Sequence, residues 1–505
     1  MILPDLLHQV PACDPALIHR DATWTFGDLI ARAGAIARAT TTTLAHGQTV
    51  AVLGDNHPDT VAAYYGVPAA GRVLTFLNHR LADEEILGQL QRSRAGTLLA
   101  SPDQARRLAP ALGDLRVVRF GDPLPAADPP SDAAPDDPAW LLFTSGTTGA
   151  PKGALLSHAN LMAAIESSAA ARPIPEDDVF AFPFPLCHVA GYNVLRTHAQ
   201  GRPVVLLDRF DPHLLTTAIA RHAVTSVSLA ATMLASLLDL LESDPGALAD
   251  AAHLRTISYG ASPMPIELLR RCDAVLDVDL SQGFGMTELS GNAVFLDAAT
   301  HRRGFRGDAS VLSAAGVVGP GVALRIVDPL DREVAEGEVG EICIAGAQVM
   351  LGYLDDTAAT DLALRGGWMH TGDLGRIRAD GLLEVVDRLK DMIVTGGENV
   401  ASLEVERAIE ASCPEATAMA VVGTPDPRWG ENVCACVTVA DGASLDVEEV
   451  ARRLVGRLAG FKTPRHLVVL DALPLTHSGK VAKAELRAHL ARNPELLGPR
   501  RGTAR

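Results

Sequence analysis

The chain is poor in aromatic residues and contains no long apolar run. Of its 505 residues, 48% are hydrophobic but only 4% are aromatic. No stretch approaches the ~18 consecutive apolar residues of a membrane-spanning helix. The N-terminus lacks the basic segment and the apolar segment that together make a secretion signal. We therefore expect a globular protein with no membrane span and no signal peptide.

Basic charge is also scarce relative to acidic charge. The chain has 44 Lys and Arg residues against 61 Asp and Glu residues, which gives a net charge of −17. A negative field of this size repels nucleic acids and anionic membrane surfaces. We expect no nucleic-acid partner, and any anionic ligand must be held by local donors.

The seven cysteines are scattered along the chain, and their number is odd. An odd number argues against a complete disulfide framework, and a reducing cytoplasm is the location that fits best. No CxxC or HExxH spacing occurs, so the sequence predicts no metal site built from Cys or paired His ligands.

The length of the chain indicates more than one domain, since domains usually have ~100–200 residues. Short apolar runs, such as residues 49–53 and 204–207, alternate with longer helix-like segments. This alternation predicts an α/β fold with layers of helices around mainly parallel sheets. A charged segment at residues 387–391 interrupts two apolar stretches. We predict a large N-terminal domain at residues 1–387, a hinge at 388–391 and a small C-terminal α+β domain at 392–505.

A glycine-rich loop with the sequence TSGTTGAPKG occupies residues 144–153 and follows an apolar strand-like run. Its three glycines allow tight turns, and its hydroxyl and N–H groups can surround phosphate oxygens. It is not a Walker A loop, because Pro151 and Gly153 stand where that motif needs Gly and Ser or Thr. The loop predicts a phosphate site formed by Thr144, Ser145, Gly146, Thr147, Thr148, Gly149 and Lys152.

Seven further short motifs follow in order along the chain. They are PLCH at 185–188, YGASP at 259–263, QGFGMTE at 282–288, GWMHTGD at 367–373, DRLKD at 387–391, GGEN at 396–399 and SGK at 478–480. With these motifs the chain resembles the adenylate-forming superfamily, which includes acyl- and aryl-CoA synthetases, firefly luciferase and the adenylation domains of nonribosomal peptide synthetases. The resemblance implies an acid–thiol ligase that forms acyl-AMP from a carboxylic acid and MgATP and then forms acyl-CoA with release of AMP. ATP and coenzyme A would be co-substrates and Mg²⁺ the metal.

The resemblance also assigns the ATP-binding residues. Phe284 offers a ring face for adenine, Thr287 can bond a phosphate, and Glu288 supplies the hard oxygen that Mg²⁺ prefers, with Thr144 as a second metal contact. Asp373 can accept the ribose hydroxyls, with Arg388 beside it. The remaining residues of this set are Gly260, Ala261, Ser262, Gln282, Gly283, Gly285 and Met286.

The resemblance implies that catalysis depends on Lys480, together with Thr287 and Glu288. Lys480 matches the lysine that bridges the substrate carboxylate and the α-phosphate while negative charge develops. Lys390 matches the hinge about which the small domain turns after adenylation. This rotation removes Lys480 and brings in the residues that surround coenzyme A, which are Gly396, Gly397, Glu398, Trp429, Phe461 and Arg465. Ala401 and Ser402 depart from the family, which usually has an aromatic residue and proline there.

The same resemblance implies an acyl pocket in which His188 acts as a gate. The predicted pocket residues are His188, Gly191, Tyr192 and Asn193. The residues of the pocket segments are mostly apolar or small, which favours a fatty or aryl monocarboxylic acid. Burial of its hydrocarbon part would contribute ~0.8 kcal/mol per CH₂. A dicarboxylate of the malonate type would need a buried basic group. The nearby candidates for it are Arg196 and His198, and the alternative for either is to face solvent. Three alternatives stay open: a dicarboxylate substrate, transfer to a carrier protein, and a catalytically silent nucleotide-binding module. A homodimer is equally open.

Overall fold

The computed structural model describes residues 1–126, 132–144, 151–260, 264–440, 442–476 and 480–497. The described chain forms two compact units, a large one and a smaller one. The first comprises Met1–Leu324, Cys343–His370 and Gly381–Leu383, and the second Arg325–Ile342, Thr371–Asp380 and Glu384–Arg505. The predicted α/β class, with a large N-terminal part and a small C-terminal part, is confirmed. The boundary at 387 and the hinge at 388–391 stay predictions.

A nine-stranded sheet in the large unit has the order β15-β14-β13-β12-β11-β9-β10-β1-β2. Strands β10, β9, β11, β12 and β13 are parallel, as predicted, whereas β14 returns antiparallel to β13. Parallel strands end at a common edge, so the carboxyl ends of β12 and β13 lie side by side. The bounds are β1 Pro15–His19, β2 Ala22–Thr25, β9 Phe180–Phe182, β10 Val204–Leu206, β11 Ser226–Leu229, β12 Thr256–Gly260, β13 Asp279–Met286, β14 Gly291–Leu296 and β15 Val317–Val318.

A seven-stranded sheet in the same unit has the order β18-β8-β7-β4-β3-β5-β6. Its strands β3, β4, β5 and β7 are mainly buried apolar runs, which is typical of parallel strands covered on both faces. At one side β7 turns back into β8 as a hairpin, and β18 pairs with β8. The bounds are β3 Thr49–Leu53, β4 Val73–Leu77, β5 Thr97–Ala100, β6 Arg116–Arg119, β7 Pro138–Thr144, β8 Lys152–Ser157 and β18 Gly352–Tyr353.

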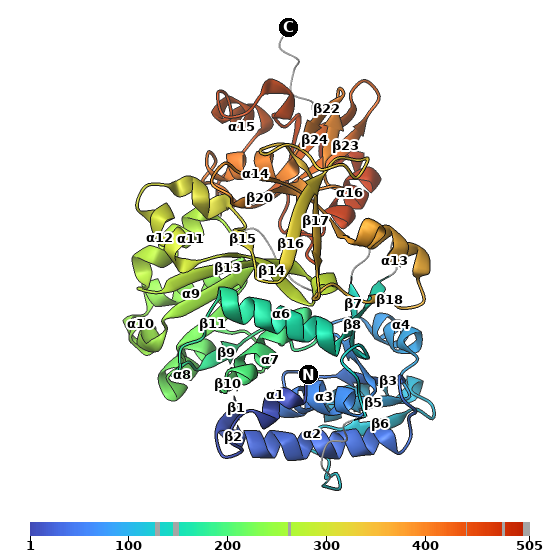
Figure 1. Cartoon of the computed structure of the whole chain (residues 1–505). Coiled ribbons are helices and arrows are strands. Elements are labelled where there is room, and N and C mark those ends of the chain that lie inside the picture. The colour runs from blue at the N-terminus through green and yellow to red at the C-terminus, as the bar shows by residue number, and fades with distance from the viewer. Residues whose placement is uncertain (127–131, 145–150, 261–263, 441, 477–479, 498–505) are drawn as a thin grey trace. The chain divides into compact units, whose positions relative to one another are not determined.

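Helices cover these two sheets (Figure 1). Helix α2 (Phe26–Thr41) begins with a capping box between Thr25 and Asp28, and α6 (His158–Ala171) begins at the Ser157 cap that the sequence indicates. Helix α7 (Tyr192–Ala199) packs on α6. The other helices are α1 Asp5–His8, α3 Pro58–Ala69, α4 Asp83–Ser93, α5 Pro102–Leu108, α8 Pro212–His222, α9 Ala231–Ser243, α10 Pro245–Asp250, α11 Ile266–Val275, α12 Ala298–Phe305 and α13 Thr357–Ala363.

The smaller unit contains a sheet in which β22, β21, β24 and β23 follow one another and β25 pairs with β24. Apolar residues of these strands and of the helices packed on them form its core. The bounds are β21 Ile393–Thr395, β22 Glu398–Val400, β23 Ala416–Asp426, β24 Gly430–Val439, β25 His466–Val469, α14 Ser402–Glu410, α15 Val447–Arg453 and α16 Lys483–Arg492. A further sheet has the order β16 (Val322–Val327), β17 (Gly340–Gly346), β19 (Met369–Ile377) and β20 (Leu383–Arg388).

No helix among the described residues combines the length and the hydropathy that crossing a bilayer requires.

Candidate active site

The hairpin β7–β8 holds the two ends of the predicted phosphate loop. Thr144, the last residue of β7, pairs with Lys152, the first residue of β8, and the Thr144 hydroxyl donates to the Lys152 carbonyl at 3.4 Å. The hairpin therefore fixes where the loop leaves and re-enters the sheet. Ser145, Gly146, Thr147, Thr148 and Gly149 lie outside the described residues.

Tyr353 connects two residues that the sequence predicts for ATP binding. Its hydroxyl donates to Oε1 of Glu288 at 2.9 Å, and the Lys152 ammonium lies 5.0 Å from the centre of its ring. Pairing of Tyr353 with Ala154 places the ring beside Lys152, two residues away on β8. Burial, and then the charge of Glu288, raise the pKa of Tyr353, so the hydroxyl keeps its proton and can donate.

Glu288 is a buried carboxylate, with 5% of its surface exposed. It lies in a single 3₁₀ turn at 287–289 that follows β13, and its carbonyl accepts from the N–H of Met350 at 2.9 Å. A carboxylate held in this way, with the Thr144 hydroxyl as a second oxygen ligand, matches the hard-oxygen preference of Mg²⁺. Thr287 is half-buried beside it.

The predicted ATP-site glycines near Phe284 also have a role in strand packing. A Cβ on Gly285 would lie 2.0 Å from the carbonyl oxygen of Gly291, and one on Gly260 would lie 2.3 Å from that of Gly283. These glycines therefore allow neighbouring strands to approach, with a bulge between Phe284 and Gly285. Phe284, Gln282 and Met286 are half-buried, so parts of their side chains remain accessible.

The predicted acyl-pocket residues follow one another at the start of α7. His188 is half-buried and precedes the 3₁₀ turn at 189–191. A Cβ on Gly191 would lie 2.3 Å from the Tyr64 hydroxyl, so only glycine fits there. Tyr192 is 2% exposed, and a Cβ on Gly291 would lie 3.0 Å from its ring. Asn193 is buried and donates to the Ala190 carbonyl at 3.0 Å. Ala261 and Ser262 lie outside the described residues.

Of the two alternatives for Arg196 and His198, the structure excludes an orientation towards solvent. Their side chains point inward from α7, with 9% of Arg196 and none of His198 exposed. The Nε2 of His198 donates to the Ala16 carbonyl at 3.0 Å, so its Nδ1 accepts from the Tyr65 hydroxyl at 2.8 Å. Burial lowers the pKa of His198 to about 4, which keeps the ring neutral at physiological pH.

The two predicted ribose contacts are paired in the smaller unit. Nε of Arg388 lies 3.1 Å from Oδ1 of Asp373. Burial raises the pKa of Asp373, and the charges of Arg388, Lys480 and Lys390 oppose this effect. The positive charges of these three predicted site residues therefore all act on the pKa of the buried Asp373 carboxylate.

Lys480 and Lys390 lie in turns of the smaller unit. The N–H of Lys480 donates to the Thr476 hydroxyl at 3.2 Å, and its carbonyl accepts from the N–H of Thr476 at 2.6 Å. His477, Ser478 and Gly479 lie outside the described residues. Lys390 is exposed, and its neighbour Asp391 forms an ion pair with Arg487.

A buried polar network, which the sequence does not reveal, adjoins the predicted hinge. The carboxylate of Asp387 accepts from both the N–H and the hydroxyl of Ser402, the latter at 2.9 Å. Lys483 donates to the Ser402 hydroxyl at 2.6 Å and pairs with Glu406 at 2.7 Å. Ser402, which replaces the usual proline, is therefore a fully buried donor in this structure.

Three of the predicted coenzyme A residues lie together in the smaller unit. The Arg465 guanidinium lies 4.7 Å from the centre of the Trp429 ring, and a Cβ on Gly396 would lie 2.7 Å from that ring. Gly397 and Glu398 are exposed on the turn that follows. Phe461 is 36% exposed, with the Lys462 ammonium 5.9 Å from its ring centre.

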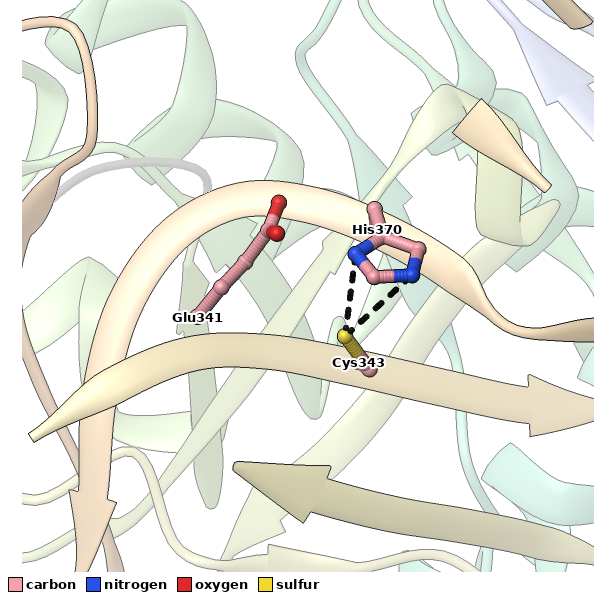
Figure 2. Close-up of side chains that lie close together, drawn as sticks. All are labelled: Glu341, Cys343 and His370. Atoms are coloured by element: carbon pink, nitrogen blue, oxygen red, sulfur yellow. Dashed lines mark hydrogen bonds between the residues drawn. The ribbon is translucent and has the colours of Figure 1, made fainter. Parts of the chain in front are cut away.

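His370, in the predicted GWMHTGD motif, is buried against Cys343. The Cys343 sulfur lies 3.3 Å from Nδ1 and 3.8 Å from Nε2 of the ring (Figure 2). Glu341, also drawn in Figure 2, is two residues before Cys343 on β17 and accepts from the N–H of Gly372 at 3.1 Å. A thiol and one imidazole supply only half of the four ligands of a structural zinc site, so we assign no metal to this pair.

The missed residue Tyr353 has no signal in the sequence that identifies it. It stands 65 residues from Glu288, and a Gly-Tyr pair alone predicts only a turn. Only the pairing of β18 with β8 brings it to the site.

Comparison with known proteins identifies the family. The family model described as AMP-binding enzyme matches residues 8–354, and that of the AMP-binding enzyme C-terminal domain matches residues 404–480. A feruloyl-CoA synthase of an Amycolatopsis species is 37% identical over 94% of this chain and 95% of its own length. A fatty acid–acyl-carrier-protein ligase of Streptomyces coeruleorubidus is 34% identical over 94% and 93%.

A solved structure shows the same architecture. The o-succinylbenzoate CoA synthetase of Bacillus subtilis, in complex with its acyl-adenylate intermediate, superposes with a TM-score of 0.85 at 29% identity, covering 96% of this chain and 97% of that one. The predicted resemblance to the adenylate-forming superfamily is confirmed. The chain belongs to the AMP-binding enzyme family and is an AMP-forming acid–thiol ligase of the acyl-CoA synthetase type.

Proposed function

We propose that the chain activates an aryl or fatty monocarboxylic acid with MgATP and transfers the acyl group to coenzyme A. The observation that carries this proposal is the group formed by Lys152, Tyr353 and Glu288. It places an ammonium group and a buried carboxylate beside the loop whose residues can surround phosphates. A phosphate charge and a divalent cation need these two kinds of group.

In the first step the acid carboxylate attacks the α-phosphorus of ATP and pyrophosphate leaves. Thr144 and Lys152, with the loop between them, hold the phosphates, and Glu288 with Thr144 holds Mg²⁺, which neutralises phosphate charge when bound. Asp373 accepts the ribose hydroxyls. Lys480 aligns the acid carboxylate with the α-phosphate and stabilises the developing charge, so catalysis consists mainly of positioning and electrostatics.

In the second step the thiol of coenzyme A attacks the acyl-adenylate and AMP leaves. We assign the pantetheine to the turn at 396–398 and the nucleotide to the Trp429–Arg465 pair, because a guanidinium stacked on an aromatic ring is well suited to phosphate. Lys390 is the hinge of the rotation that moves Lys480 out of the site and brings this turn into it. A carrier protein is the second candidate acceptor, since one relative is named as a carrier-protein ligase.

For the acid itself, an aromatic compound of the cinnamate type is our first choice. Feruloyl-CoA synthases from two genera are 37% identical to this chain. The half-buried residues Val189 and Ala190 offer apolar surface for a flat ring or a hydrocarbon chain. A hydrocarbon chain of medium length is the alternative within the same class.

The test is a panel of acids in two assays. ATP–pyrophosphate exchange with ferulate, benzoate, butyrate, octanoate, palmitate and malonate reports adenylation, and AMP release with coenzyme A or with a carrier protein reports the acceptor. We expect exchange with an aryl or fatty acid and AMP release with coenzyme A. Exchange with malonate alone, or thioester on the carrier protein alone, would overturn the corresponding part of the proposal.

A further inference from the structure

Two arginine side chains meet where α6 and α7 pack together. Arg172 follows the last residue of α6, and Arg196 lies in the last turn of α7 with 9% of its surface exposed. Nη2 of Arg196 donates to the backbone carbonyl of Arg172. Nη2 of Arg172 donates to the Ser168 hydroxyl at 2.7 Å and to the Tyr192 hydroxyl at 3.1 Å. All these acceptors are neutral.

Neither guanidinium has an acidic partner among the residues that the structure describes. The buried Nε atoms of both Arg172 and Arg196 have no hydrogen-bond acceptor there. Asp178 is the acidic group whose charge acts on Arg196, but its two oxygens accept from Thr225 at 2.6 Å and Ser226 at 2.9 Å, and it forms no ion pair with either arginine in the described chain.

Burial lowers the pKa of Arg196 to about 9, and the charge of Arg172 adds to this effect. Arg196 still carries a positive charge at neutral pH. A buried cation beside a second, half-buried cation is costly without an anion, because desolvation and mutual repulsion both disfavour it. A ligand that brings negative charge would reduce both the cost of desolvation and the repulsion between the two arginines.

The pair lies next to the predicted acyl pocket. The ring of Tyr192 packs against Gly291, which follows the Glu288 turn by three residues, and its hydroxyl is directed to Arg172. The Arg172 guanidinium lies 5.1 Å from the centre of the Phe295 ring. Phe295 lies four residues beyond Gly291 on β14. The Arg172 guanidinium beside Phe295 is therefore further along this strand from the Glu288 turn than the contact of Tyr192 with Gly291.

We propose that Ser168, Arg172, Tyr192 and Arg196 form an anchoring site for an oxygen group at the end of the acyl chain or ring opposite the reacting carboxylate. The inference rests on the proposed adenylation and CoA transfer, and it departs from the monocarboxylic class by adding a distal oxygen group, a second carboxylate included, to the acid. A distal carboxylate is the best ligand, because it accepts charge-assisted hydrogen bonds from guanidinium groups and supplies the missing negative charge. A methoxyl oxygen accepts a hydrogen bond only. Malonate is too short to reach from one end to the other.

The test uses three acids that differ only in the group at the far end of the ring. They are cinnamate, 4-methoxycinnamate and 4-carboxycinnamate, compared by kcat/KM in ATP–pyrophosphate exchange. In the unaltered enzyme we expect kcat/KM for 4-carboxycinnamate to exceed that for cinnamate by about 10- to 100-fold, with the value for 4-methoxycinnamate between them. In Arg172→Met and Arg196→Met the preference disappears, while kcat/KM for cinnamate stays within about threefold. Arg221→Met, at an exposed ion pair with Asp21, is the control and keeps the preference.

Thermal unfolding provides a second measurement that does not need turnover. We expect Arg196→Met to unfold at the same or a higher temperature, because an apolar side chain replaces an uncompensated buried cation. 4-Carboxycinnamate without ATP should raise the Tm of the unaltered enzyme and leave that of both variants unchanged. An equal shift in enzyme and variants, no shift in any of them, or equal kcat/KM for the three acids in the unaltered enzyme would overturn the anchoring site. Failure of all three acids to be adenylated would instead refute the proposed function, and the Tm shift would still decide the site.

Discussion

The hydroxyl of Tyr353 donates a hydrogen bond of 2.9 Å to the carboxylate of Glu288, 65 residues away in the chain. The same ring lies under the Lys152 ammonium, so one tyrosine contacts the acidic and the basic group of the predicted ATP site. Residues that orient a metal-binding carboxylate influence its affinity even when they do not touch the metal. Tyr353 is in this sense a positioning residue.

Replacement of Tyr353 by Phe tests this role. The change removes the hydroxyl and keeps the ring beside Lys152, so we expect about 10-fold more Mg²⁺ to be needed for half-maximal pyrophosphate exchange. Tyr65→Phe removes a buried hydroxyl that is bonded to His198, and it should leave the Mg²⁺ dependence unchanged. Equal Mg²⁺ curves for Tyr353→Phe and the unaltered enzyme would show that Glu288 does not need this hydrogen bond.

Replacement of Lys480 by Ala should separate the two half-reactions. Loss of a charge directed at the transition state costs ~10²–10³ in rate, so pyrophosphate exchange should fall by this factor. Thioester formation from supplied acyl-adenylate should be retained. Lys462→Ala, which removes a lysine paired with Glu404, is the control and should keep adenylation. An equal loss of both half-reactions in folded Lys480→Ala would contradict the proposed division of roles.

Replacement of Lys390 by Pro should have the opposite effect. Proline restricts φ to about −65° and resists rotation at the predicted hinge. We expect pyrophosphate exchange to persist while CoA-dependent AMP release falls at least 10-fold, and Lys390→Ala to retain both. If Lys390→Pro kept both activities, the hinge would have to lie elsewhere.

The buried contact between Ser402 and Asp387 should contribute to stability. Ser402→Ala removes the hydroxyl that donates to Asp387 and accepts from Lys483. Leaving buried charged groups under-bonded should lower the free energy of unfolding by ~1–3 kcal/mol. Ser402→Pro also removes the N–H donor and should cost more. Urea unfolding of the three proteins measures the effect, and identical midpoints would mean that the network contributes nothing.

The stability of the large unit should fall in mild acid. Burial lowers the pKa values of His158 and His198 to about 4 each, below the unfolded value of 6.5. The unfolded chain therefore binds more protons below pH 6.5, and stability falls as the pH drops from 6.5 towards 4. The full loss is on the order of 3 kcal/mol for each histidine. Urea unfolding between pH 7 and pH 4 measures it, and His198→Asn should flatten the curve whereas exposed His213→Asn should not.

Much of the site was predictable because its chemistry is local in the chain. The Thr-Gly-rich loop, the Glu288 turn and the Asp373–Arg388 pair each depend on short motifs, and strand alternation indicated the parallel sheets. The glycines at 260 and 285 were predicted for ATP binding, and the structure shows that they also have a packing role: carbonyl groups of neighbouring strands occupy the space where a Cβ would stand. A motif identifies which residue is needed at a position, and the packing around that residue gives the physical reason.

The sequence by itself determined the family and the α/β class, and it predicted the residues of the ATP site, because each depends on composition, on periodicity or on motifs of a few residues. Only the tertiary structure decided the partners of these residues. Tyr353 reaches Glu288 through the pairing of β18 with β8, and Arg196 turns inward against Arg172 because of how α7 packs on α6. Contacts between residues distant in the chain depend on strand register and helix packing, and no local pattern in the sequence encodes them.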